Sequence, residues 1–85
     1  ETAYTIMNGE YEVIEADIIE TSELINQSLK DSNLPDEIRV GAVLRNGKVI
    51  IPRSDFIFKK KDTVVFLAKK DAISIVENLF RISSI

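Results

Sequence analysis

The side chains that could do chemistry in this sequence are mainly carboxylates, lysines and hydroxyls. Five carboxylates share one short segment, at Glu10, Glu12, Glu15, Asp17 and Glu20. Paired carboxylates can act as general acid and base when one of them is desolvated and its pKa is raised. However, Glu15 and Asp17 alternate along an expected strand, a pattern more typical of a solvent-facing surface. The carboxylates therefore do not predict an active site.

The other common catalytic groups are missing or badly spaced. The sequence has no histidine and no cysteine, so the commonest general base, a thiol nucleophile and the usual zinc ligands are absent. Ser28 and Lys30 are the wrong distance apart for a serine–lysine pair, and no Ser-x-x-Lys occurs. No segment has the alternating oxygen ligands of an EF-hand, and the three glycines lie too far apart to cradle a phosphate. We predict a protein that is not an enzyme and has no metal site.

Positive charge is concentrated at five lysines: Lys59, Lys60, Lys61, Lys69 and Lys70. Two interpretations are open. The lysines either keep a turn and a strand end solvated, which we favour, or form an anion site for a small phosphate ligand. The net charge of −3 and the pI near 4.9 argue against a nucleic-acid partner, because nucleic-acid-binding domains carry a basic surface.

The chain length of 85 residues suits one domain. Its longest unbroken apolar run, residues 64–68, is far shorter than the roughly 20 residues of a membrane span. No signal peptide is recognisable at the start, and the first residue is Glu1, so we expect a piece of a longer protein. Residues 1–9 show no periodicity and are predicted to be a linker remnant before a domain of residues 10–85.

The elements that would position these groups begin with a half-buried strand after Glu10, in which Ile14, Ala16 and Ile18 share one face. The segment "TSELINQSLKDSNLP" then predicts a short helix over residues 26–31, ended by Pro35.

A hairpin is predicted about Asn46-Gly47, the dipeptide typical of a type I′ turn. Residues 38–45 alternate, with Ile38, Val40, Ala42 and Leu44 expected on one face. A two-residue loop would set Arg45 opposite Lys48, Leu44 opposite Val49, Val43 opposite Ile50 and Ala42 opposite Ile51. Pro52 would lie at the end of the second strand, because proline cannot donate to the ladder.

Residues 56–58 are expected to anchor a loop that crosses the core. Residues 63–68 predict a strand that is apolar on both faces, hence central and covered on both sides. A last helix is expected to start at a cap, Asp71, and to run past Arg81 to Ile82.

The predicted fold class is α+β, a two-layer sandwich with the order β-α-β-β-β-α and helices on one face of a mostly antiparallel sheet. One long helix cannot cover both apolar faces of the sheet, and contiguous apolar surface usually marks a partner site. The sequence therefore predicts a homodimer.

The stretch "VGAVLRNGKVIIPRSDFIFKKKDTVVFLA" resembles the C-terminal regulatory domain of the TrkA family, also called the RCK C-terminal domain. The residues that carry the resemblance are Arg45, Asn46-Gly47, Val49 to Pro52, Ser54-Asp55 and Lys61-Asp62. Upstream, further positions match: Glu15, Ser22, Leu24, Ser28, Leu29, Leu34 and Pro35. The tail "AISIVENLFRISSI" is similar to the closing helix of the potassium-uptake regulators after which the family is named. Lys61 departs from the pattern, since the family has glycine before Asp62; if that glycine takes a positive φ, the turn here must differ or be strained.

The resemblance implies a cytoplasmic regulatory domain of a potassium or other cation transport protein, held at the inner face of the cell membrane by its transporter partner. It also implies a Rossmann-type nucleotide-binding domain earlier in the same chain, a membrane potassium channel subunit as partner, dimerisation and, in some members, a small ligand such as cyclic di-AMP. No cofactor is expected in this fragment itself.

Arg45 and Pro52 occupy places that resemble the family's ligand-contacting strand ends. The plainer interpretation makes Arg45 a solvated neighbour of Lys48 and Pro52 a strand terminator. The alternative function is a purely structural dimerisation module that binds no ligand.

Overall fold

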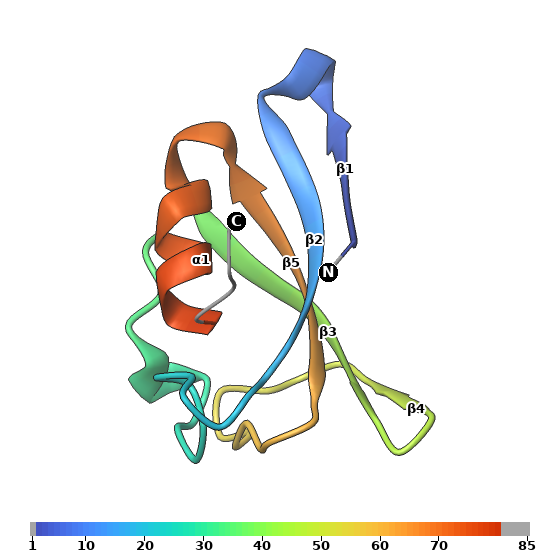
Figure 1. Ribbon diagram of the computed structural model, residues 1–85, viewed down its shortest axis with the longest axis vertical. Coiled ribbons are helices and arrows are strands. Elements are labelled where there is room, and N and C mark those ends of the chain that lie inside the picture. The colour runs from blue at the N-terminus through green and yellow to red at the C-terminus, as the bar shows by residue number, and fades with distance from the viewer. Residues whose placement is uncertain (1, 81–85) are drawn as a thin grey trace.

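Five strands form one antiparallel sheet, and an α-helix packs against one of its faces (Figure 1). The computed structural model describes residues 2–80. The strands are β1 Thr2–Ile6, β2 Tyr11–Asp17, β3 Ile38–Arg45, β4 Lys48–Ile50 and β5 Thr63–Lys69, and the helix is α1 Ile73–Phe80. Three single-turn 3₁₀ helices complete the elements: η1 Met7–Gly9, η2 Lys30–Ser32 and η3 Lys70–Ala72. The predicted α+β class is confirmed.

The sheet has the order β1-β2-β5-β3-β4, so the last strand in the sequence lies in the middle. β5 pairs with β2 on one side and with β3 on the other, both antiparallel. Its sequence explains this place, because β-branched and aromatic residues dominate it and side chains of both faces are apolar. The prediction of a central strand is confirmed.

The hairpin between β3 and β4 has the predicted turn and register. Asn46 and Gly47 have φ angles of 53° and 76°, the positive values that a type I′ turn requires at both positions. Arg45 pairs with Lys48, Leu44 with Val49 and Val43 with Ile50. β4 ends at Ile50, so the expected pairing of Ala42 with Ile51 falls outside the ladder.

A β-bulge at Gly41 reverses the faces of β3. Val40 pairs with Phe66, but the next pair is Ala42 with Val65, so Gly41 is the extra residue. Ile38 therefore points into the core, as does Val43, whereas Ala42 and Leu44 lie on the opposite face. The predicted face of Ile38, Val40, Ala42 and Leu44 is wrong after Val40, because simple alternation does not allow for the extra residue.

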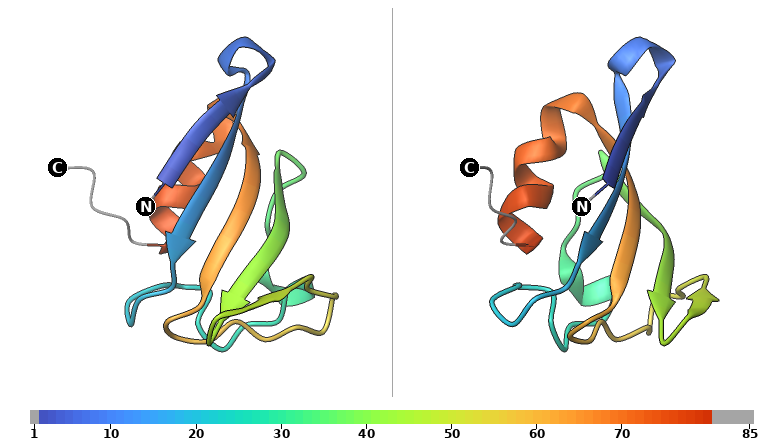
Figure 2. Two further views of the ribbon diagram at one scale, coloured as in Figure 1. Left: turned by 90° about the vertical axis from the view of Figure 1, so that its right-hand side faces the viewer. Right: turned by 45° about the vertical axis from the view of Figure 1, so that its right-hand side comes forward.

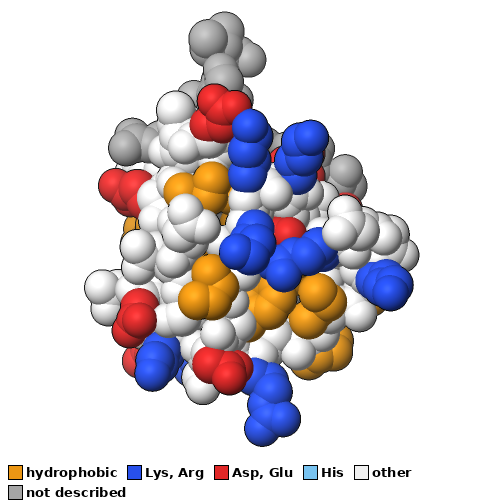
Figure 3. Space-filling view, turned by 90° about the horizontal axis from the view of Figure 1, so that it is seen from below, with side chains coloured by type: hydrophobic (Ala, Val, Ile, Leu, Met, Phe, Trp, Pro, Cys, Tyr) orange, Lys and Arg blue, Asp and Glu red, His pale blue; other side chains and the backbone are white. Residues whose placement is uncertain are grey.

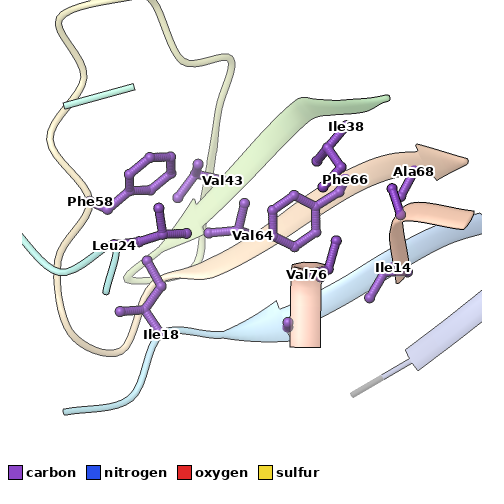
Figure 4. Packing of buried hydrophobic residues seen from close by; sticks show 12 residues of the cluster. Ile14, Ile18, Leu24, Ile38, Val43, Phe58, Val64, Phe66, Ala68 and Val76 are labelled. Carbon is purple, nitrogen blue, oxygen red and sulfur yellow. The ribbon is translucent and has the colours of Figure 1, made fainter. Parts of the chain in front are cut away.

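The core lies between α1 and one face of the sheet, and Figure 4 shows its side chains interdigitating. Strands β2, β3 and β5 supply Ile14, Ala16, Ile38, Val43, Val64, Phe66 and Ala68, and the segments beside them supply Ile18, Leu24, Phe58, Ala72 and Val76. Phe58 has no exposed surface, and its ring meets Phe56 edge to face at 5.4 Å between centroids. The prediction that residues 56–58 anchor a loop holds for both phenylalanines, whereas the Ile57 side chain is 42% exposed.

The helix predicted over residues 26–31 is wrong. Asn26 has a φ of 64°, which a right-handed helix cannot include. Its N–H donates to the Phe58 carbonyl at 2.8 Å, and the Leu29 N–H donates to the Phe56 carbonyl at 2.8 Å. The segment therefore pairs with the loop that follows β4, and only η2 is helical.

Two predicted boundaries also change. Residues 1–9 were expected to be a linker remnant, but residues 2–6 form β1, which pairs along β2 from Thr2–Glu15 to Ile6–Tyr11. Asp71 does not cap α1, because it lies inside η3, where no side chain caps the first turn. The predicted continuation of the helix through Arg81 and Ile82 lies outside the described residues.

Candidate functional site

A salt bridge between Arg45 and Asp62 joins the hairpin to the start of β5. The Arg45 Nε donates to Asp62 Oδ1 at 2.7 Å and the Nη2 donates to Oδ2 at 2.6 Å. Two parallel bonds of this kind fix orientation as well as distance, because the planar guanidinium matches the carboxylate. The Asp62 side chain is 2% exposed and that of Arg45 is 28% exposed.

Further contacts extend this ion pair into a network. The Lys59 backbone N–H donates to Asp62 Oδ2 at 2.8 Å, and the Arg45 Nη2 also donates to the Ile57 carbonyl at 2.9 Å. The guanidinium carbon lies 4.8 Å from the centre of the Phe56 ring, within cation–π range. The network therefore holds the loop of residues 56–62 against the end of β3.

The pKa values of both partners are shifted by this contact. Burial alone would raise the pKa of the Asp62 carboxyl, but the hydrogen bonds from Arg45 and the Lys59 N–H, together with nearby positive charge, outweigh burial and lower it. The hydrogen bond to Asp62 raises the pKa of Arg45. Both groups are charged at neutral pH, and the buried carboxylate has a full set of partners.

Arg45 and Pro52, the residues predicted to contact a ligand, have different surroundings. The Arg45 guanidinium is occupied by Asp62 and the Ile57 carbonyl, so it is not the solvated neighbour of Lys48 that the plainer interpretation expects. Pro52 is half-buried just after β4, as a strand-terminating proline would be. Contact of either residue with a ligand stays a prediction. The sequence pattern did not reveal that Asp62 is the partner of Arg45. The two residues are 17 positions apart and meet only because the end of β3 lies beside the start of β5.

Lys61 has a φ of 75°, in the region that glycine adopts without strain and other residues rarely do. Its N–H donates to the Ile18 carbonyl at 3.0 Å, which fixes the backbone there. This is the position where the family pattern has glycine. The positive φ of Lys61 is therefore consistent with the strain that was expected there.

A groove of about 650 Å³ runs beside this turn. Two carboxylates and two lysines line it together with apolar and hydroxyl side chains: Asp17, Ile18, Ile19, Glu20, Thr21, Lys60, Lys61 and Thr63. Lys60 pairs with Glu20 at 2.6 Å, and the Thr63 hydroxyl donates to Asp17 at 2.6 Å. Because its charges balance, this groove does not favour a phosphate. Lys69 and Lys70 lie at the other end of β5, so the five lysines do not form one cluster.

The face of the sheet opposite α1 is not covered by any other part of the described chain, and it faces the viewer in the left panel of Figure 2. We call it the outer face. Its middle is apolar, and its side chains are half-buried or exposed: Val13, Ala42, Leu44, Val65 and Leu67. Leu67 is 37% exposed. The prediction that β5 is covered on both sides is therefore wrong for the chain by itself.

Charged side chains lie at both ends of the outer face. Arg39 and Lys69 lie at the end where β5 runs into η3, close to the acidic Asp36 and Glu37. Glu15 and Asp17 lie toward the other end, on β2, where Asp17 pairs with Thr63. The outer face thus has an apolar middle between two charged ends.

Within residues 2–80, no three acidic side chains gather closely enough to hold a metal ion. In the same range, no helix is long and apolar enough to cross a membrane.

The family is decided by comparison with known sequences. The profile described as "TrkA-C domain" matches residues 13–81, which include most of β2, all of β3, β4 and β5, and all of α1. This chain belongs to the TrkA-C domain family. The resemblance carried by the hairpin and by Lys61-Asp62 is thereby confirmed.

Similar proteins carry matching names. The "Trk system potassium uptake protein TrkA" of Azorhizobium caulinodans is 42% identical over 80 residues, which are 94% of this chain and 18% of that protein. The "Trk system potassium uptake protein TrkA homolog" of Archaeoglobus fulgidus is 28% identical over 76 residues, 89% of this chain and 17% of that protein. The chain therefore spans less than a fifth of the length of these TrkA-type relatives.

A solved structure described as "Structure of RCK domain with cda" has a similar fold. It aligns with a TM-score of 0.66 at 18% identity and covers 80% of this chain and 96% of that chain. At this identity the match shows the fold alone, an α+β sandwich of the RCK type.

Proposed function

We propose that this chain is a regulatory domain of a potassium-uptake protein and that it acts as a homodimer joined through the outer face. Membership of the TrkA-C domain family supports the regulatory role. The uncovered outer face is the observation that supports dimerisation, because soluble domains rarely leave contiguous apolar surface without a partner. The relatives are named as potassium uptake proteins, which fits a domain that is not an enzyme.

The arrangement of side chains on the outer face suits a second copy. A two-fold axis lying between two facing sheets and running across their strands would reverse one copy end to end. The apolar side chains would then meet in the middle, and the charged ends would lie at the rim of the contact. An apolar centre of this kind can meet its own copy across a two-fold axis.

Sedimentation equilibrium tests the dimer directly. We expect a dimer in the micromolar range and a monomer after Leu67→Asp, since a charge would be buried at the centre of the contact. Ile75→Asp on α1 is the matched control, because Ile75 is 40% exposed against 37% for Leu67 and lies away from the outer face. A wild-type chain that stays monomeric at high micromolar concentration would contradict the dimer.

In the longer protein, we propose that this domain follows a Rossmann-type nucleotide-binding domain and influences a membrane potassium channel subunit from the inner face of the membrane. The supporting observation is that the TrkA-type relatives are more than five times as long as the matched part. Cross-linking of the full-length protein in membranes, followed by mapping of linked peptides, tests both contacts. Links confined to soluble proteins would count against the channel subunit.

Ligand sensing is the second part of the proposal, with a small nucleotide such as cyclic di-AMP as the ligand. Its support is the family and a solved relative whose description names a bound molecule, cda. A ligand present at 100 times its Kd stabilises the folded state by about 2.7 kcal/mol. A thermal-shift series with cyclic dinucleotides and mononucleotides should therefore show a large rise in Tm for one of them. No rise with any of them would favour the alternative, a purely structural dimerisation module.

A further inference from the structure

Positive charge and exposed apolar side chains coincide at the end of the molecule that carries the β3–β4 hairpin. Residues 45–61 hold six of the eleven Lys and Arg of the chain and one of its fourteen acidic residues. Figure 3 looks at this end from below and shows Lys and Arg side chains next to a group of hydrophobic ones. Residues 45–61 are thus basic in a chain with a net charge of −3, and we call this end of the molecule the basic tip.

The apolar part of the basic tip is unusually exposed. Val49 is 68% exposed, Ile51 is 72% exposed and Ile57 is 42% exposed. Val49 and Ile51 come from β4 and the residue after it, at the edge of the sheet. Exposing β-branched residues to water on a projecting hairpin stabilises nothing within the chain, so a partner outside it is the simplest physical explanation.

Most of the positive charges at the basic tip are free to act outside the chain. Within the described residues, Arg45 pairs with Asp62 and Lys60 pairs with Glu20. Lys48, Arg53, Lys59 and Lys61 are exposed and have no carboxylate within ion-pair distance in the part of the chain that the structure describes. Long side chains of this kind can keep their charges in the polar layer when neighbouring apolar groups are buried.

We propose that the basic tip docks on a lipid bilayer that contains anionic lipid. Lysines attract the negative surface of such a bilayer at about 1 kcal/mol each, a roughly fivefold gain in affinity. Exposed Val and Ile side chains then enter the boundary between headgroups and acyl chains, as the apolar face of an interfacial helix does. This surface goes beyond the proposed regulatory function. It borders the outer face, because Val49 pairs with Leu44 and shares its side of the sheet.

The shape of the tip favours a bilayer over an acidic protein partner. The hairpin projects from the sheet as a narrow loop (Figures 1 and 2), and the other cations of the tip belong to the loop that follows β4. A bilayer presents mobile anionic headgroups that can gather around such a convex tip. A protein partner would instead need a matching concave surface of about 800 Å².

Co-sedimentation with vesicles tests the proposal. The chain should bind vesicles of phosphatidylcholine mixed with phosphatidylglycerol and should not bind vesicles of phosphatidylcholine alone, and salt should weaken the binding. Replacing Lys48, Lys59 and Lys61 together by Gln should reduce the binding on the order of 100-fold, because none of the three has an ion pair among the described residues. Replacing Ile51 by Ser should also reduce it, and this loss should persist at high salt because it is apolar in origin.

The control replaces Lys70 by Gln, since Lys70 is exposed in η3, at the far end of β5. This variant should bind the mixed vesicles less than about twofold more weakly, because Lys70 lies outside the contact. Circular dichroism establishes that each variant is folded. Equal losses in the two lysine variants would overturn the docking geometry. Binding to immobilised polyglutamate without binding to mixed vesicles would assign the tip to an acidic protein and overturn the bilayer.

Discussion

Replacing Lys61 by Gly should make this domain more stable. The Lys61 backbone has a φ of 75°, and its side chain is exposed, without an ion pair among the described residues. The substitution therefore removes a β-carbon from a strained position and breaks no observed side-chain contact. The backbone bond from the Lys61 N–H to the Ile18 carbonyl is retained.

The expected gain follows from two opposing effects. A residue with a β-carbon pays about 1 to 2 kcal/mol in the left-handed region. Glycine offsets about 0.4 to 1 kcal/mol of this gain, because a glycine gives the unfolded chain more conformational freedom, which is lost on folding. We expect the free energy of unfolding to rise by about 0.5 to 1 kcal/mol and Tm to rise by about 3 to 6 °C for a domain of this size.

Urea denaturation measures the change, and two control variants isolate its cause. Lys61→Ala removes the long side chain but keeps the β-carbon, so it should give no gain. Lys59→Gly inserts glycine at a neighbouring residue that does not have a positive φ, so it should lose about 0.5 to 1 kcal/mol. If Lys61→Gly is no more stable than Lys61→Ala, backbone strain at this position is not the cause and the reasoning fails.

Two more predictions concern the ion pair beneath the hairpin. Arg45→Ala should destabilise the domain by about 2 to 4 kcal/mol, because it leaves the buried Asp62 carboxylate with only the Lys59 N–H. Lys30→Ala, at an exposed position away from this ion pair, should cost less than about 0.5 kcal/mol in the same urea series. The lowered pKa of Asp62 means that the folded state holds its proton less tightly than the unfolded state. The stabilisation of the folded state by the ionised Asp62 is therefore complete above a pH of about 4. It is lost as the pH falls through the pKa of Asp62 in the folded state, which is lower than in the unfolded state. Tm measured from neutral to acidic pH should fall across this window, and Asp62→Asn should lose part of that slope; equal slopes would exclude Asp62 as the titrating group.

The sequence could predict those parts of the fold that depend on local signals. Asn46-Gly47 determined a turn and, through the two-residue loop, the pairing of Arg45 with Lys48. The two apolar faces of residues 63–68 predicted a central strand. Both signals act within a few residues, where backbone conformation and side-chain alternation decide the outcome.

Features that depend on distant partners could not be predicted in this way. The segment about Asn26 has helix-compatible spacing, but its N–H groups are taken by the carbonyls of Phe56 and Phe58. The bulge at Gly41 shifts one strand by a residue, and alternation alone does not locate such an insertion. Arg45 could be singled out by resemblance, yet its partner Asp62 became visible only when the strand ends were brought together.

The place of β5 in the sheet has a consequence for folding. β2 and β3 both pair with β5, and they are not neighbours of each other in the sheet order. Until residues 63–69 are available, the chain can form only two separate hairpins, and isolated hairpins are marginal in water. During synthesis the core of this domain therefore cannot close before almost the whole of it has left the ribosome. Pairing strands that are some 50 positions apart also makes the final step slow compared with helix formation. A domain synthesised earlier in the same chain would thus be free to fold while this one is still waiting for its central strand.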